Sequence, residues 1–284
     1  MSRALSAFHG PFGRATLYAL DRPLIKHAHR EAHLLFFLGG APGAITVRDD
    51  PIALDDSIAV AVNPWEEHGF SPLRRLGAGH YLIFYFNPQW LRKTMPSPGP
   101  RHRLFEAARV PLLPAMRVLR DDICQALLNG GVLPLVFEQL LVALVKNLHA
   151  LPRSGREMPP ISEDDGNWAH LDFRLRKSMT ALSPTLPLSV NLGGIARNAG
   201  LSRAHFFKLF RDQIGLTPAI YMNALRIETA LQGIALSDAS VTDISDQLGF
   251  SCQSAFSRFF SAHVGMAPTD YRRAVQILGL PLHA

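Results

Sequence analysis

The chain has 284 residues, of which 48% are hydrophobic and 18% charged, and its formal net charge at pH 7 is +6. This composition excludes an intrinsically disordered chain and supplies enough apolar residues for two folded domains. Two cysteines are too few for a disulfide framework, and neither a secretory leader nor an uncharged run of roughly 18 apolar residues is present. We therefore expect a cytoplasmic protein without a membrane span.

The N-terminal region alternates short β-rich runs with glycine and proline breakers. Strands are predicted at Ala15–Leu20, His33–Leu38, Ala44–Arg48, Ser57–Val62 and His80–Phe86. Regular short strands that are separated by turn signals favour a small antiparallel barrel or jelly roll.

Four histidines fall within this predicted barrel. His27, His29 and His33 stand close together in the sequence, and His68 follows a later strand. Residues i and i+2 of a strand face the same side, so His27 and His29 are expected to converge, and barrel closure can bring His68 to them. Imidazoles suit zinc, iron, copper or nickel. Two interpretations stay open: a transition-metal site, or polar residues at a barrel mouth that contact an organic effector.

The pattern then becomes helical. Apolar residues recur at helical spacing through Arg101–Leu128 and Pro134–Leu148. Residues 151–167 are rich in proline, glycine, serine and charge, which predicts a linker. The sequence thus predicts one domain over residues 1–150 and another over residues 168–284.

The C-terminal region contains an internal repeat. Ile195–Ser202 returns as Ile244–Ser251 at an offset of 49 residues. After one extra residue the offset becomes 50, and Phe206, Phe210, Gly215, Pro218 and Tyr221 return as Phe256, Phe260, Gly265, Pro268 and Tyr271. Each copy is predicted to form a short scaffold helix, a glycine turn and a longer recognition helix. This is the helix-turn-helix pattern of DNA-binding proteins.

Capping residues define the boundaries of these helices. Asn191 and Ser202 are predicted N-caps in the first copy, and Ser240 with Asp243 forms a predicted capping box in the second. A helix from Pro218 to about residue 234 connects the copies as a rod of roughly 25 Å. Such a rod suits two recognition helices in successive major grooves, which lie about 34 Å apart.

The outward faces of the two recognition helices supply the candidate DNA contacts. These residues are Arg203, Ala204, His205, Phe207, Lys208 and Arg211 in the first copy, and Cys252, Gln253, Ser254, Ser257 and Arg258 in the second. Arginine and lysine suit guanine or phosphate, and glutamine suits adenine. Two interpretations remain for Phe207, which suits either a thymine methyl group or packing against the connecting helix.

Residues from about Leu171 to Arg273 resemble the AraC/XylS family of bacterial transcription regulators. The matching residues include Ile195-Ala196, Gly200-Leu201-Ser202, Phe210, Gly215, Pro218, Arg226-Ile227, Ala230, Ile244, Gly249-Phe250-Ser251, Phe256, Phe260, Gly265, Pro268 and Tyr271-Arg272. Ser245 departs from the alanine usual in the family, and we expect its hydroxyl to bond back to a helix carbonyl.

The resemblance implies an α+β architecture. A cupin-like, effector-binding β-barrel with a helical dimerisation segment precedes an all-α domain with two helix-turn-helix units. It also implies an effector-responsive activator that binds double-stranded promoter DNA as a homodimer, senses a small molecule and contacts RNA polymerase. The region from Trp168 onward carries a net charge of +4, which agrees with a DNA partner.

Two other functions remain as alternatives. One is a metal-dependent cupin enzyme with an accessory helical domain, although no catalytic residue can be nominated, because no acid–base pair accompanies the histidines. The other is a constitutive DNA-binding protein whose barrel only dimerises.

Overall fold

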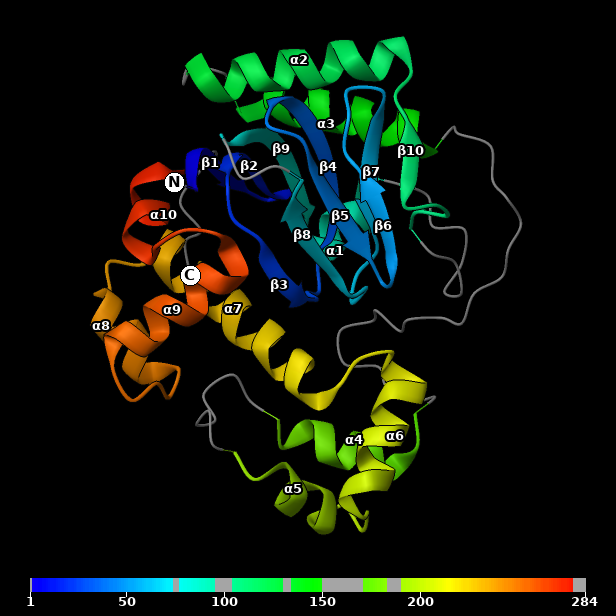
Figure 1. Cartoon of the computed structure of the whole chain (residues 1–284), viewed down its shortest axis with the longest axis vertical. Coiled ribbons are helices and arrows are strands. Elements are labelled where there is room, and N and C mark those ends of the chain that lie inside the picture. The colour runs from blue at the N-terminus through cyan, green and yellow to red at the C-terminus, as the bar shows by residue number, and fades with distance from the viewer. Residues whose placement is uncertain are drawn as a thin grey trace.

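The computed structural model describes residues 2–73, 77–94, 104–129, 134–149, 171–182 and 190–277. The linker predicted at 151–167 lies outside these residues. A β-rich N-terminal part is followed by helices and by an all-α C-terminal part that carries one short final strand, as Figure 1 shows. Within the described ranges, no helix is long and apolar enough to cross a membrane.

Two β-sheets make up the N-terminal part in the described residues. The larger sheet has the strand order β10-β7-β4-β9-β2-β1-β11, and the smaller has the order β3-β8-β5-β6. The strands of the larger sheet are β1 (Arg3–Gly10), β2 (Gly13–Leu20), β4 (Ala32–Gly40), β7 (Ile58–Val62), β9 (Gly79–Phe86), β10 (Arg109–Pro111) and β11 (Val275–Ile277). Those of the smaller sheet are β3 (Leu24–His27), β5 (Gly43–Val47), β6 (Asp50–Ala53) and β8 (His68–Pro72).

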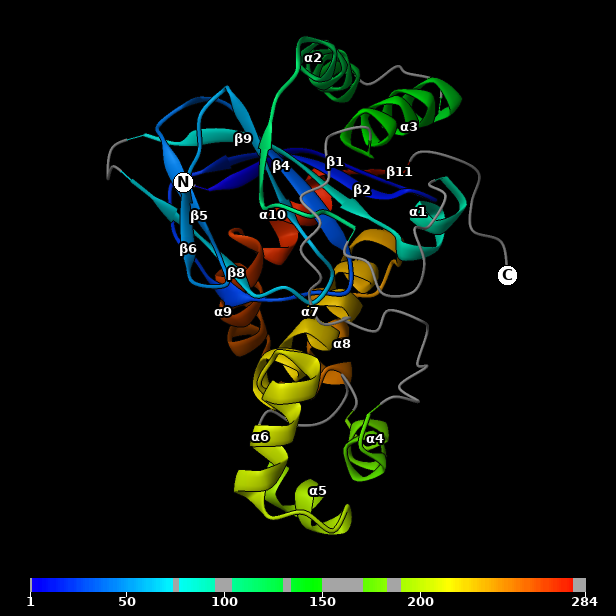
Figure 2. The same ribbon diagram turned by 90° about the vertical axis from the view of Figure 1, so that its right-hand side faces the viewer.

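Both faces of the larger sheet are covered, so its strands are apolar on both sides. In β9, Leu82, Phe84 and Phe86 face one core, whereas Tyr81 and Ile83 face another. The first core lies under α2 (Pro114–Asn129) and α3 (Pro134–His149), which cross this face in Figure 2. A short helix, α1 (Pro88–Thr94), follows β9.

The five predicted strands correspond to β2, β4, β5, β7 and β9. The helix predicted over Arg101–Leu128 is wrong at its start, because Arg109–Pro111 forms β10 beside β7 and the helix begins only at Pro114. Proline lacks the amide hydrogen that a helix interior needs, so Pro111 and Pro114 prevent an earlier helix.

Seven helices make up the C-terminal part in the described residues. They are α4 (Phe173–Thr180), α5 (Leu192–Asn198), α6 (Arg203–Ile214), α7 (Pro218–Leu236), α8 (Val241–Gln247), α9 (Gln253–Val264) and α10 (Pro268–Ala274). Helices α4, α5 and α6 form a lobe at one end of α7, and α8, α9 and α10 surround its other end beside the sheets (Figure 1).

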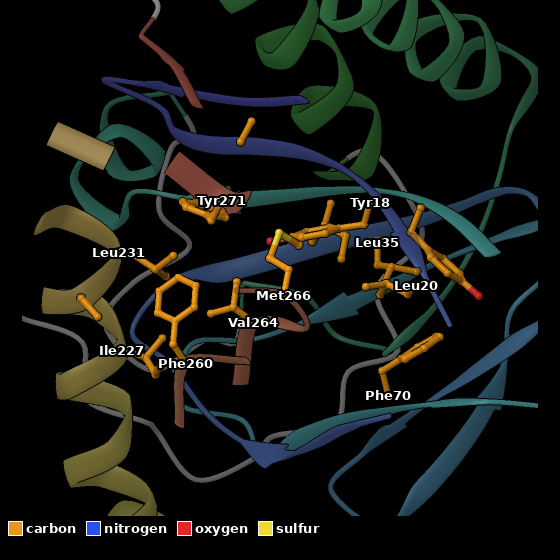
Figure 3. Packing of buried hydrophobic residues seen from close by; sticks show 14 of the residues in the cluster. Tyr18, Leu20, Leu35, Phe70, Ile227, Leu231, Phe260, Val264, Met266 and Tyr271 are labelled. Atoms are coloured by element: carbon orange, nitrogen blue, oxygen red, sulfur yellow. The ribbon is translucent and has the colours of Figure 1, made fainter. Parts of the chain in front are cut away.

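The second helix-turn-helix unit shares one core with the β-sheets. Figure 3 shows Phe260 and Val264 of α9 and Leu231 of α7 pointing towards the region where Tyr18 and Leu20 of β2 lie. Strand β11 follows α10 and pairs in parallel with β1. The second unit is therefore attached to the β-sheets both by apolar packing and by strand pairing.

Candidate DNA-binding surface and histidine pocket

The first helix-turn-helix unit consists of α5 and α6, and its boundaries follow the predicted caps. Asn191 Oδ1 accepts a hydrogen bond of 2.9 Å from the Gly194 amide, and Ser202 Oγ accepts one of 3.2 Å from the His205 amide. Gly200 between the helices has φ +75°, a left-handed conformation that glycine adopts without strain.

The second unit consists of α8 and α9. Ser240 and Asp243 form the predicted capping box at the start of α8. Helix α6 begins directly after Ser202, whereas α9 begins two residues after Ser251, because Cys252 takes the N-cap position without a side-chain bond. The extra residue that shifts the repeat offset from 49 to 50 is thus accommodated in the turn before α9.

Ser245 on α8 is fully buried, and its hydroxyl has no hydrogen-bond partner among the described residues. The expected bond back to a helix carbonyl is therefore wrong. A buried hydroxyl without a partner costs about 1–3 kcal/mol.

Ser245→Ala is expected to raise the free energy of unfolding by about 1 kcal/mol, because it removes that cost and alanine favours helix. Chemical denaturation of the full chain measures the change. Ser178→Ala is the matched control, since this buried hydroxyl donates to the Leu175 carbonyl oxygen at 2.6 Å. If Ser245→Ala destabilised the chain as much as the control, the hydroxyl would be satisfied in solution.

The candidate DNA contacts all lie on α6, on α9 or at the N-cap of α9. Their side chains are exposed at Arg203, Ala204, His205, Lys208, Arg211, Cys252, Gln253, Ser254 and Arg258, and half-buried at Phe207 and Ser257. Each recognition helix thus presents a polar face to solvent and an aromatic stripe to the core.

Local contacts distinguish some of these side chains. The Phe207 ring packs edge-on against Phe206 with 5.9 Å between centroids, and the Arg203 guanidinium lies 5.4 Å from the Phe207 ring centroid. Both of these contacts lie within α6. Lys208 Nζ lies 2.6 Å from an Asp212 carboxylate oxygen, so its charge is already paired within α6.

The four predicted histidines form one cluster, and His27 and His29 of this cluster also line a cavity. His27 ends β3, His29 lies in the following loop, His33 belongs to β4 and His68 begins β8. The ring centroid of His68 lies 4.3 Å from that of His27, 5.0 Å from that of His29 and 4.5 Å from that of His33. Strand alternation is not the cause for His29, since β3 ends at His27; the loop carries His29 into the pocket.

Backbone carbonyls fix two of these rings. The Nδ1 atom of His27 lies 2.7 Å from the Ile25 carbonyl oxygen, and that of His68 lies 2.8 Å from the Glu66 carbonyl oxygen. A carbonyl only accepts, so Nδ1 carries the proton in each ring and Nε2 keeps its lone pair. Burial lowers the pKa of His68 to about 3, and burial followed by the neighbouring His68 lowers the pKa of His27 well below its usual value. Both imidazoles are neutral at pH 7.

A partly buried ion pair borders the pocket, with the Arg14 side chain buried and the Glu31 side chain 24% exposed. Arg14 Nη2 lies 3.2 Å from Glu31 Oε2, and the Arg14 guanidinium lies 3.4 Å from the Tyr85 ring centroid. Leu24 of β3 and Ile227 of α7 complete an apolar side of the same cavity, which has a volume of about 40 Å³.

His263 is a pocket residue that sequence reasoning missed. It lies on α9, and its ring centroid is 6.2 Å from that of His27. The available signal was its position beside Val264 on the buried stripe of the recognition helix, where a histidine is unusual. Arg14, a charged residue immediately before the predicted strand Ala15–Leu20, was missed in the same way.

Comparisons with known proteins agree with this architecture. A helix-turn-helix domain family matches residues 195–274. The probable transcriptional regulator LumQ of Photobacterium leiognathi is 33% identical over 256 residues, which cover 89% of this chain and 94% of LumQ. The transcriptional activator RhaS of Escherichia coli (strain SE11) is 37% identical over 84 residues, 30% of each chain. The crystal structure of ToxT from Vibrio cholerae O395 shares the fold, with a TM-score of 0.54 at 12% identity over 92% of this chain and 96% of ToxT.

Proposed function

The chain belongs to the AraC family of helix-turn-helix transcription regulators, and from this premise we propose that it binds promoter DNA through α6 and α9 in successive major grooves. The observation that carries the proposal is the pair of capped recognition helices, both with exposed polar faces, at opposite ends of α7 (Figure 1). The eleven candidate contacts are the residues assigned to this role, with Arg258 the leading phosphate or guanine ligand.

The length of α7 supports two grooves rather than one. Its 19 residues extend over about 28 Å at 1.5 Å per residue. Successive major grooves on one side of DNA are separated by about 34 Å. Each recognition helix packs beside an end of α7. The distance between the two recognition helices can therefore approach the separation of the two grooves while both helix-turn-helix units stay folded.

We further propose that the chain is a cytoplasmic transcription activator that responds to an effector and contacts RNA polymerase. The cavity between the β-sheets and helices α7 and α9 supports the effector, because an ion or a very small ligand bound there would touch both parts of the chain. No catalytic role is proposed, because LumQ, which matches nearly the whole chain, is named as a regulator. In this proposal, residues 1–150 form the domain that binds the effector and dimerises, and residues 168–284 form the DNA-binding domain. Residues 151–167 are the linker between them.

Dimerisation is proposed through α3, with a second copy of this chain as the partner. The Leu135 side chain is 73% exposed, and a shallow groove beside it is lined by Val142 and Ala143. This groove, which is also lined by Glu138, Gln139 and Lys146, lies on the far side of the larger sheet from α9 (Figure 2), so pairing there leaves the recognition helices accessible.

Leu135→Glu is expected to convert a dimer into a monomer, because it places a charge in the apolar contact. Light scattering coupled to size exclusion measures the molar mass. Leu73→Glu, at a 55% exposed leucine after the last strand of the smaller sheet, is the control and should leave the dimer intact. A wild-type chain that is monomeric at high concentration would contradict this proposal.

DNA binding itself is tested by fluorescence anisotropy with the DNA upstream of the chain's own gene, against scrambled DNA, across a salt series. We expect preferential binding at physiological salt and a log–log salt slope of several. If the two DNAs bind equally, selection from genomic fragments supplies the next substrate. Failure to enrich any fragment in that selection would contradict the proposal.

A further inference from the structure

We propose that the histidine pocket binds a divalent transition-metal ion through His27, His29 and His68, with His263 of α9 as a fourth ligand that ties the second recognition helix to the barrel. The observations that support the metal site are independent of the proposed function. Its effect on DNA rests on the function proposed above.

The ligand atoms are already gathered. One imidazole nitrogen from each of His27, His29 and His68 lies within 4.8 Å of the others. Nitrogen atoms around a tetrahedral ion with bonds of 2.0–2.1 Å are about 3.4 Å apart. Side-chain rotations that shorten these separations by about 1.4 Å or less therefore close the site around an ion.

The hydrogen bonds of the pocket leave these nitrogens available. The Ile25 and Glu66 carbonyls hold the protons on Nδ1 of His27 and His68, so both Nε2 atoms keep lone pairs. His29 Nε2 lies 3.1 Å from His33 Nδ1, and His29 Nδ1 is buried without a hydrogen bond in the described part of the chain. His33 thus orients a ligand in the way that outer hydrogen-bond partners do in metal sites.

The chemistry and size of the cavity select the kind of ligand. Uncharged imidazoles are ligands for zinc, cobalt, nickel or copper rather than for magnesium or calcium, which require oxygen. The cavity of about 40 Å³ exceeds the roughly 10–15 Å³ that one water needs but is far below the roughly 300 Å³ of an organic-ligand pocket. An ion with a bound water fits this space.

His263 gives the site a route to the DNA-binding surface. Its Nδ1 lies 2.8 Å from the Phe259 carbonyl oxygen, so Nδ1 carries the proton and Nε2 keeps its lone pair. Coordination of this atom joins α9 to β3, which carries His27. The recognition residues Gln253, Ser254 and Arg258 stay exposed while α9 packs on the barrel. The ion therefore holds α9 in a binding-competent position and raises DNA affinity.

Cobalt is the probe for the site itself. The full chain without a histidine tag is stripped with chelator and titrated with Co²⁺, and we expect one ion per chain with the visible absorption of a tetrahedral imidazole complex. His68→Gln should weaken binding at least tenfold. His80→Gln, an exposed histidine of β9, should not change it. Absence of stoichiometric binding to the wild-type chain overturns the proposal, whatever the variants do.

Zinc then tests the link to DNA. Saturating Zn²⁺ should raise the affinity of the wild-type chain for its selected DNA about fivefold or more. His263→Ala should retain a metal ion on the remaining histidines and lose that increase. If Zn²⁺ binds and leaves DNA affinity unchanged, the role of His263 is overturned. If Co²⁺ binds but the chain enriches no DNA, the metal site stands and the proposed DNA function fails.

Discussion

Phe260→Ala is expected to lower the free energy of unfolding by about 3–5 kcal/mol, the range for removing a buried aromatic ring. Phe260 on α9 is 0% exposed, and its ring centroid lies 5.8 Å from that of Phe256 and 6.0 Å from that of Tyr271. The same core continues into the β-sheets, as Figure 3 shows, so the loss extends beyond the second helix-turn-helix unit. Chemical denaturation followed by circular dichroism measures it.

The matched control is Phe173→Ala, which makes the same chemical change at a side chain that is 65% exposed on α4. Exposed substitutions of this kind change stability by about 0.5 kcal/mol or less. Equal losses for the two variants would mean that Phe260 is not buried in a packed core in solution.

Arg258→Ala is expected to reduce promoter affinity by about 1–3 kcal/mol, which corresponds to roughly 5- to 150-fold. Arg258 is exposed on α9, and its guanidinium can donate to a guanine or to a phosphate. If it contacts a base, the loss is concentrated on the selected DNA. If it contacts phosphate, affinity falls for all sequences and the salt slope decreases by about one. Anisotropy titrations on selected and scrambled DNA distinguish the two.

Arg22→Ala removes the same charge from an exposed position after β2 and controls for net charge alone. Arg258→Ala with the affinity and salt slope of this control would exclude Arg258 from the DNA interface.

The helix-turn-helix units could be predicted from the sequence because their signals are local. Asn191, Ser202 and the Ser240–Asp243 pair cap helices within three residues of themselves, and Gly200 lies at the turn where its left-handed conformation is required. The second copy repeats the cap of the scaffold helix and the turn glycine, Gly249 with φ +74°, whereas the N-cap of its recognition helix, Cys252, makes no side-chain bond. Caps and turn glycines depend little on the rest of the fold.

The missed features depend on contacts that are distant in the sequence. Strand β11 pairs with β1, which lies more than 260 residues earlier, and no local pattern marks a three-residue strand. His263 joins the histidine pocket only because α9 packs against β3. The four predicted histidines could be grouped because they lie on or beside predicted strands, but the rings of His27 and His68 are oriented by hydrogen bonds to the backbone carbonyls of Ile25 and Glu66, which strand alternation does not describe.

Hydroxyl-radical footprinting of the full chain on its selected DNA tests the central claim most directly. Two recognition helices separated by α7 predict two protected patches on one face of the duplex, about 10 base pairs apart. Arg203→Ala should weaken one patch and Arg258→Ala the other. A single protected patch, or one that both variants affect equally, would contradict the claim that one chain uses α6 and α9 in successive major grooves.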